Sequence, residues 1–165
     1  MARWTESLMK LFDFLVSEAT VDELDCTEKQ PVIQELIDKL VEGGKLKKKD
    51  AGSVLKAIMD RENLGSTGIG RGVAVPHTKH AAVKQLTGCL GRSRKGVSFA
   101  AIDGEPVHLI FLLISPPDQP GPHLKALEHI SVVLRDENFS RFLKRARDKD
   151  ELISLIAEAD EKLLK

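Results

Sequence analysis

The residues of this 165-residue chain that could carry chemistry are concentrated around residues 66–80, STGIGRGVAVPHTKH. Nucleotide loops carry G-x-G-x-x-G between a strand and a helix, or end in G-K-[ST]. Here the spacing is G-x-G-x-G and the glycines precede a strand-like run, which disfavours a nucleotide site. His77 and His80 are three residues apart and could suit zinc on a helix, but Pro76 and the strand-like run disfavour a metal site. We therefore expect neither a cofactor nor a metal.

Two interpretations of His77 stay open on the residues alone. In the first, the glycines turn the chain and His77 is a structural residue. In the second, His77 is a nucleophile, because imidazole titrates near neutrality and its neutral form can attack at cellular pH. Pro76 restricts the backbone before His77, and the exposed N–H groups of a glycine-rich turn can bind a phosphoryl group.

Two further residues could help such a nucleophile to hold a phosphoryl group. We expect Gly121 to be the N-cap of a helix and Pro122 its first residue, which places His123 in the first turn. The start of a helix attracts anions and disfavours the charged imidazolium. Arg61 lies at the end of the helix before the glycines, and its guanidinium could clamp phosphate.

The other histidines are expected to be bystanders. His129 falls on the polar side of its helix and should face solvent, and His108 begins an apolar strand and should be structural. His80 is assigned no role.

Hydrophobic periodicity predicts the elements that must position these side chains. A helix over 5–17 and an edge strand over 19–24 precede a helix that starts after Thr27 and ends at the glycine pair 43–44. A second helix follows Asp50. The expected strands are 73–75, 86–93 and 107–115, and helices follow at 122–136, 138–147 and 149–160. The strand 107–115 is apolar on both faces, so it should be central in a mixed sheet between helical layers, in a single α/β domain.

Composition excludes several classes of function. Lys and Arg number 25 and so do Asp and Glu, and Tyr is absent, which disfavours nucleic-acid binding. The basic clusters at 45–50 and 141–150 are best explained as solvated helix faces, with a docking patch as the alternative. The two cysteines have no motif spacing. The N-terminus does not read as a signal peptide, and the strongest apolar run, residues 107–114, is too short to span a bilayer. We expect a cytoplasmic protein.

The run over residues 61–77, RENLGSTGIGRGVAVPH, resembles the active-site signature of the fructose/mannitol-type enzyme IIA domains (EIIA type-2). These belong to the bacterial phosphoenolpyruvate-dependent phosphotransferase system (PTS). The resemblance extends over nearly the whole chain, so that 1–165 is a single PTS EIIA type-2 domain, and it is closest to the nitrogen-regulatory IIA branch. It also includes AIDGEPVHLIFLLISP and the HLKAL…LRD segment. It implies a mixed, about five-stranded sheet sandwiched between helical layers, and no metal or nucleotide.

The resemblance implies a phosphotransferase component that works through a phosphohistidine. His77 matches the histidine that accepts a phosphoryl group on Nε2 from HPr or a nitrogen-type HPr. His123 and Arg61 match the positions that stabilise that group. Position 78 is usually small in the family, and Thr78 departs from this.

The implied function is a phosphocarrier that passes the group to a IIB component or uses it as a regulatory signal toward target proteins. The alternative is a free-standing sugar-specific (fructose/mannitol) IIA component. A module that only keeps the fold and binds without phosphorylation is a third hypothesis. Any contact with the membrane would be indirect, through a permease.

Overall fold

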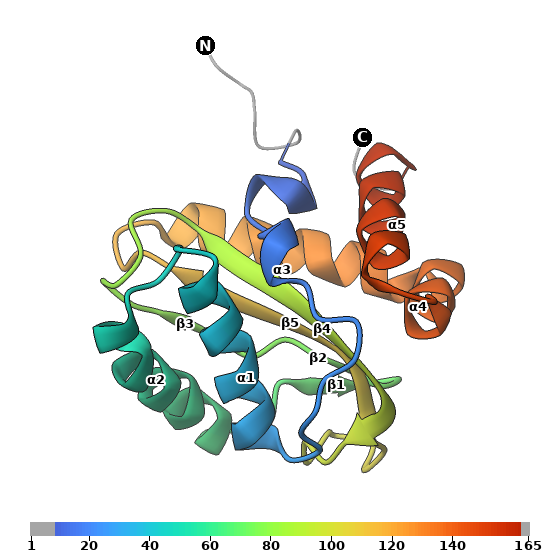
Figure 1. The fold of residues 1–165 in the computed structure, drawn as a ribbon, viewed down its shortest axis with the longest axis horizontal. Coiled ribbons are helices and arrows are strands. Elements are labelled where there is room, and N and C mark those ends of the chain that lie inside the picture. The colour runs from blue at the N-terminus through green and yellow to red at the C-terminus, as the bar shows by residue number, and fades with distance from the viewer. Residues whose placement is uncertain (1–8, 163–165) are drawn as a thin grey trace.

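The computed structural model describes residues 9–162, in which helices cover both faces of a mixed sheet (Figure 1). The strands are β1 (Gly68–Gly70), β2 (Val73–Ala74), β3 (His77–Lys79), β4 (Thr87–Val97) and β5 (Val107–Ser115). The helices are α1 (Lys29–Glu42), α2 (Ala51–Asn63), α3 (Pro120–Arg135), α4 (Glu137–Arg145) and α5 (Lys149–Lys162). The predicted fold class, a mixed five-stranded sheet between helical layers, is confirmed.

Strand β5 lies at the centre of the sheet. Strands β2 and β3 pair with it in parallel along one edge, one after the other, and β4 pairs antiparallel along the opposite edge. Strand β1 extends the sheet beyond β2 as an antiparallel hairpin. This topology places His77, the first residue of β3, opposite Leu113 of the central strand.

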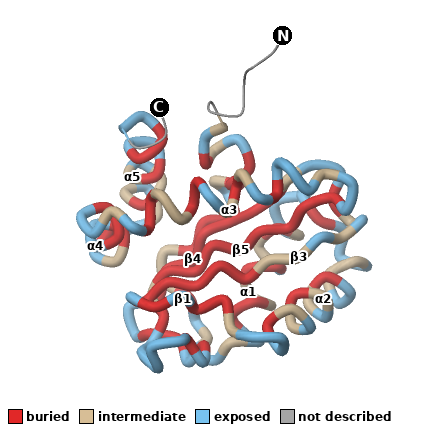
Figure 2. The backbone as a smooth tube through the Cα atoms, turned by 180° about the vertical axis from the view of Figure 1, so that it is seen from behind, coloured by how far each residue is buried: buried red, intermediate tan, exposed pale blue. Residues whose placement is uncertain are grey.

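The apolar sequence of β5 is explained by burial on both faces (Figure 2). Ile110 and Leu112 pack with α1 and α2, whereas Leu109 and Phe111 pack with α3, α4 and α5. Successive side chains of a strand point to opposite faces, so a strand between two helical layers has no solvated face. The prediction that 107–115 is the central, doubly covered strand is therefore confirmed.

Helices α1 and α2 confirm the predicted apolar stripes, but the caps differ. Helix α1 ends before the glycine pair as predicted, whereas its N-cap is Glu28 and not Thr27. The carbonyl of Thr27 accepts a hydrogen bond from the N–H of Ser98 at 2.8 Å, which holds this residue to the end of β4 instead. Asp50 takes the N-cap position of α2, but its side chain makes no capping hydrogen bond.

The predictions for the N-terminal region were wrong. Residues 1–8 lie outside the described part of the chain, and the rest of the expected helix over 5–17 is two 3-10 turns, Leu11–Asp13 and Ser17–Ala19. The expected edge strand over 19–24 is reduced to a single bridge at Val21. Residues 15–28 instead run along the outer edge of β4, where the N–H of Val21 donates to Leu90 at 2.9 Å. This cover protects an otherwise open sheet edge.

Candidate functional site

His77 stands where the chain leaves β2 and Pro76 and enters β3. Its half-buried imidazole has a fixed orientation, because Nδ1 lies 2.7 Å from the carbonyl oxygen of Val75. A carbonyl can only accept a hydrogen bond, so Nδ1 carries the proton. In the neutral ring, the lone pair is then on Nε2. The backbone two residues upstream thus selects Nε2 as the nucleophilic nitrogen.

His123 lies on α3, which follows β5 in the chain, whereas His77 precedes β5; the fold brings the two rings together. The centroids of the two rings are 5.5 Å apart and their planes are inclined by 56°. His123 is buried, and its Nδ1 shares a short hydrogen bond with Oγ of Ser115, the last residue of β5. The structure therefore brings together two of the three predicted site residues.

The pKa of His123 is lowered to about 4. The largest cause is burial, which disfavours the charged ring, and the positive charges of His77 and Lys79 add to it. His123 is therefore neutral at pH 7, and with Nδ1 engaged by Ser115 its Nε2 is the nitrogen that can face a ligand.

The predicted start of α3 was wrong by two residues. The N-cap is Gln119 and the first helical residue is Pro120, not Pro122. The N–H of His123 donates to the carbonyl of Gln119 at 3.3 Å, so His123 already closes the first turn. A proline at N1 loses no hydrogen bond, which makes Pro120 the better start. His123 keeps its place at the positive end of the helix.

Arg61 caps its own helix in this structure. The half-buried side chain donates from Nη1 to the carbonyl of Gly65 at 2.8 Å, just beyond the end of α2. Among residues 9–162, no hydrogen bond or ion pair joins Arg61 to His77 or His123. The predicted clamp is thus located near the glycine segment but is engaged with the main chain.

A buried ionic network fixes the loop between α2 and the glycines, and the sequence did not reveal it. Glu62 is 4 % exposed and accepts a hydrogen bond from Nζ of Lys29 at 2.9 Å. Its carboxylate also accepts from the N–H of Thr67 at 3.2 Å and, through a shorter contact, from the Thr67 hydroxyl. The network ties α1 to the residue before β1. The only hint of this network in the sequence is that Glu62 falls in the last turn of a helix.

The remaining histidines do not join the site. His80 accepts from the N–H of Ala82 at Nδ1 and lies 2.8 Å from Oγ of Ser53 at Nε2, so both of its nitrogens serve the local structure. His108 is bonded to the carbonyl of Ser93, in agreement with a structural role. The prediction that His129 faces solvent was wrong, because its side chain is buried on α3.

Thr78 turns its hydroxyl to the backbone. Its Oγ1 donates to the carbonyl of Lys79 at 3.2 Å, and no bond from Thr78 to His77 is found within the described region. Across the same described residues, no group of three or more His, Cys, Asp or Glu side chains is placed to share a metal ion.

Comparison with known proteins shows the family to which the chain belongs. Residues 13–159 match the model of the family described as "Phosphoenolpyruvate-dependent sugar phosphotransferase system, EIIA 2". The chain belongs to this family. The EIIA assignment made from the residues 61–77 is therefore confirmed.

Individual relatives of this EIIA domain carry two kinds of name. A nitrogen regulatory protein of Bradyrhizobium diazoefficiens is 34 % identical over 149 residues, which are 90 % of this chain and 95 % of that protein. A fructose-specific EIIABC component of Bacillus subtilis is 35 % identical over 92 % of this chain, but the chain spans only 24 % of that protein. The crystal structure of the nitrogen regulatory protein IIA-Ntr from Neisseria meningitidis superposes with a TM-score of 0.78 at 33 % identity, over 87 % of this chain and 97 % of that one.

The helices of the EIIA domain are too short or too polar for a bilayer, in the part of the chain that the structure describes. This agrees with the expectation drawn from the short apolar run at 107–114.

Proposed function

We propose that this EIIA domain is a phosphocarrier that accepts a phosphoryl group on Nε2 of His77 from an HPr-type protein. The observation that carries the proposal is the bond from Nδ1 of His77 to the Val75 carbonyl, 2.7 Å long. It keeps the proton on one nitrogen and leaves the other as the nucleophile, with a buried neutral histidine 5.5 Å away, centroid to centroid. Both nitrogens of His80 are engaged, whereas His108, whose Nδ1 also bonds to a carbonyl, has no ring contact with a second histidine within the described residues.

In the transfer, the lone pair on Nε2 of His77 attacks the phosphorus of the donor's phosphohistidine in line with the bond that breaks. The new P–N bond forms as the old one breaks, and the electron pair of the old bond returns to the donor's imidazole. The His77 ring gains positive character, and the Val75 carbonyl stabilises it through Nδ1–H. Donor and acceptor are both imidazoles, so catalysis is alignment and charge stabilisation.

His123 acts as a neutral donor to the phosphoryl oxygens. In the proposed arrangement the Ser115 hydroxyl is the donor in its bond with Nδ1 of His123, so the ring proton of His123 is on Nε2. Its low pKa means that it provides a hydrogen bond without repelling the cationic character that His77 acquires. The start of α3 adds the positive end of the helix dipole.

Arg61 is the mobile part of the proposed site. It is proposed to release the Gly65 carbonyl and to turn its guanidinium to the phosphoryl group once that group is present. Its present acceptor, the Gly65 carbonyl, is neutral and exposed, whereas a phosphoryl group is charged and can accept two hydrogen bonds from the guanidinium, so the phosphoryl group can displace the carbonyl.

The function is regulatory in the reading that we favour, with phosphorylated and unphosphorylated forms binding different target proteins in the cytoplasm. Several relatives that match nearly end to end are named nitrogen regulatory proteins, and this supports it. The match to a fructose-specific component supports the second candidate, a sugar-specific IIA that hands the group to a IIB component. A fructose-specific EIIA component of Haloferax volcanii, matched over 97 % of its length, also supports the second candidate. The mannitol IIA of Escherichia coli, 22 % identical, has been solved in complex with phosphorylated IIB.

Labelling tests the phosphocarrier proposal directly. The chain is incubated with phosphoenolpyruvate, enzyme I and either a sugar-type or a nitrogen-type HPr, and acid-labile phosphate is measured. We expect labelling of the native chain and of a His80→Gln control, and none of His77→Ala. Phosphorus NMR should show the Nε2 isomer of phosphohistidine. Equal labelling of His77→Ala, or an Nδ1 isomer, would contradict the proposal.

The two candidate roles are separated by the acceptor. Phosphorylated chain is mixed with a fructose- or mannitol-type IIB protein, and transfer of the label is followed. Transfer of the label from this chain to the IIB protein, at a rate similar to that of the transfer from HPr to this chain, supports the sugar-specific role. Retention of the label, with phosphorylation-dependent capture of other proteins by native chain but not by His77→Ala, supports the regulatory role.

A further inference from the structure

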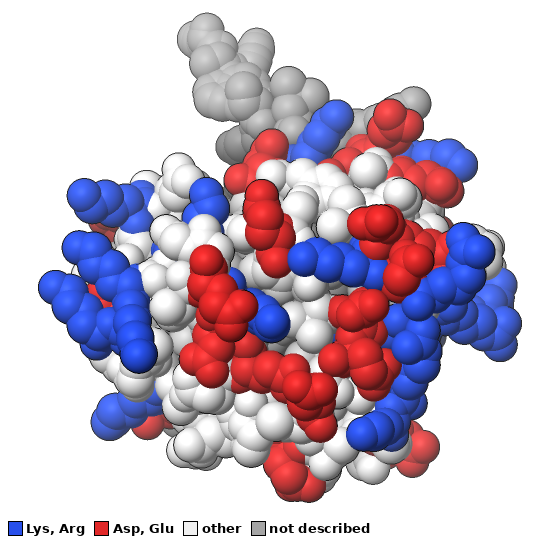
Figure 3. Space-filling view, viewed as in Figure 1, with Lys and Arg blue, Asp and Glu red and all other residues white. Residues whose placement is uncertain are grey.

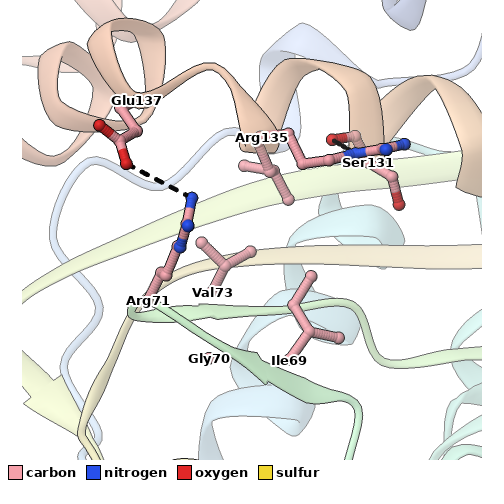
Figure 4. Close-up of a pocket in the computed structure, with 8 residues that line it drawn as sticks. Ile69, Gly70, Arg71, Val73, Ser131, Arg135 and Glu137 are labelled. Carbon is pink, nitrogen blue, oxygen red and sulfur yellow. Dashed lines mark hydrogen bonds and ion pairs between the residues drawn. The ribbon is translucent and has the colours of Figure 1, made fainter.

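A recess that no histidine lines opens between the β1–β2 hairpin and the junction of α3 with α4 (Figure 4). Its volume is about 610 Å³, and this is within the usual range for sites that hold a small molecule. Ile69, Val73 and Leu134 provide apolar walls, and Ser131 points into it from α3. A smaller hollow of about 280 Å³ continues from it along α4 and shares Arg71.

Arg71 enters this recess from an unusual backbone conformation. It has a φ of 61° and is followed by Gly72 with a φ of 77°, so the two-residue turn between β1 and β2 has the signs of a type I′ turn. The first position of that turn favours Asn, Asp or Gly, and another residue there costs about 1 kcal/mol. A residue kept in a disfavoured conformation is a sign that its side chain serves a purpose.

Two contacts hold Arg71 in place. Its N–H donates to the carboxylate of Asp103 at 3.0 Å, and its carbonyl accepts from Nζ of Lys144 on α4. Because the main chain is anchored on both sides, the guanidinium is presented across the recess toward Glu137 (Figure 4).

The lining of the two hollows carries a strong excess of positive charge. The cations are Arg71, Arg135, Arg141, Lys144 and Arg145, and the one carboxylate in the lining is that of Glu137. Burial lowers the pKa of Lys144, and the nearby Arg71 lowers it further, which shows how closely the positive charges are placed. Figure 3 shows Lys and Arg gathered at the right-hand edge of the molecule, where Figure 1 places α4.

The ion pair between Arg71 and Glu137 is weak enough to be replaced. The distance between Nη1 and Oε1 is 3.7 Å and both side chains are mostly exposed, and such pairs contribute at most about 1 kcal/mol. An incoming dianion could take Arg71 from Glu137 and find Arg135 and the Ser131 hydroxyl in the same recess. Arg141, Lys144 and Arg145 line the adjoining hollow.

We propose that this recess binds a small dianion, a phosphomonoester or a dicarboxylate, whose carbon skeleton packs on Ile69, Val73 and Leu134. The basic cluster at 141–150 thus has a docking role rather than being only a solvated face. The site is separate from the histidine pair, since neither His77 nor His123 lines either hollow, and Arg135 follows His123 by about 18 Å along α3 at 1.5 Å per residue. It does not depend on phosphoryl transfer, so ligand and phosphohistidine can be present together.

The test uses the unphosphorylated full chain and nitrogen-15 NMR, with no component of the relay present. The probes are phenyl phosphate and phthalate, with benzyl alcohol as the uncharged comparison. We expect saturable shifts of the amides at residues 69–73 and 131–145 with at least one dianion at millimolar concentrations, and none with benzyl alcohol. Arg71→Asn should bind at least tenfold more weakly while folding at least as well, because Asn suits the turn. Lys48→Asn removes one exposed positive charge elsewhere and should leave the affinity unchanged.

Three results would overturn the proposal. They are the absence of saturation with both dianions, equal affinity in Arg71→Asn and native chain, and shifts confined to His77, His123 and their neighbours. The last result would mean that the anions bind only at the histidine pair. Because the experiment needs no phosphoryl donor, its failure says nothing about labelling of His77, and failure of labelling says nothing about this recess.

Discussion

The buried His123 should make the protein less stable in mild acid. Replacing this one residue should remove that part of the pH dependence. Its pKa is lowered from 6.5 to about 4 in the folded protein, first by burial and then by the charges of His77 and Lys79. Between these two values the unfolded chain binds the proton more strongly than the folded one. The contribution of His123 to the free energy of unfolding is therefore fully present above pH 6.5 and is lost as the pH falls toward 4.

The size of the effect follows from the shift. If the whole shift applied, stability would fall by about 2 kcal/mol between pH 7 and pH 5. The ring lies next to the accessible His77, and solvent screening there reduces the expected loss to about 1 kcal/mol. His123→Asn removes the titrating group and can still bond to Ser115. The variant should therefore show a smaller fall over the same interval.

Urea unfolding at pH 7, 6 and 5 measures this difference. Circular dichroism is the suitable signal, because a chain with no Tyr and one Trp offers few fluorescent probes of unfolding. The other titrating groups are common to both proteins, so the comparison isolates His123. Parallel pH profiles for native chain and His123→Asn would refute the assignment of a strongly lowered pKa, and with it the neutral donor in the proposed transfer.

Three further predictions concern the framework. Gly88→Ala should destabilise the fold by about 2 kcal/mol, since its Cβ would lie 2.6 Å from a carbonyl oxygen of β5. The control Gly52→Ala, with open space around it, should be neutral or stabilising. The midpoints of urea unfolding measure both effects. Glu62→Gln should cost about 2 kcal/mol by breaking its buried ion pair, and should speed amide exchange in the loop after α2. Of the two thiols, only Cys26 should react with a disulfide reagent in native chain, since Cys89 is buried and burial raises its pKa; both should react in urea.

The parts of the fold that the sequence predicted are those that a local pattern determines. The double-faced apolarity of 107–115 required two helical layers, and the stripe on α1 required one buried face. The N-terminal region failed because its N–H groups bond to partners far along the chain. One example is the bond from Leu11 to Asp160 on α5, at 2.6 Å. Periodicity carries no record of such distant acceptors.

His129 shows the same limit on a single helix. The spacing of α3 predicts one buried face and places His129 outside it, yet its side chain is buried. Helix α3 shares a core cluster with β5 and packs on α4 and on the turn Leu11–Asp13, so more than one of its faces is covered. A rule that allows each helix one buried face must fail where three elements surround it.

In the candidate site too, the residue identities could be predicted from the sequence, but the contacts made by distant residues could not. His77 and His123 could be named from residue type and resemblance, but what makes them different from each other could not. The Val75 carbonyl gives His77 its free Nε2, and the Ser115 hydroxyl with burial gives His123 its neutral ring. One partner is a main-chain atom and the other is the last residue of an apolar strand, so neither has a signature in the sequence. In the proposed function the two imidazoles act as nucleophile and donor because these partners fix their tautomers. Ser115 ends β5, and Val75 lies between β2 and β3, which both pair with β5, so the proposed chemistry of the pair depends on the sheet.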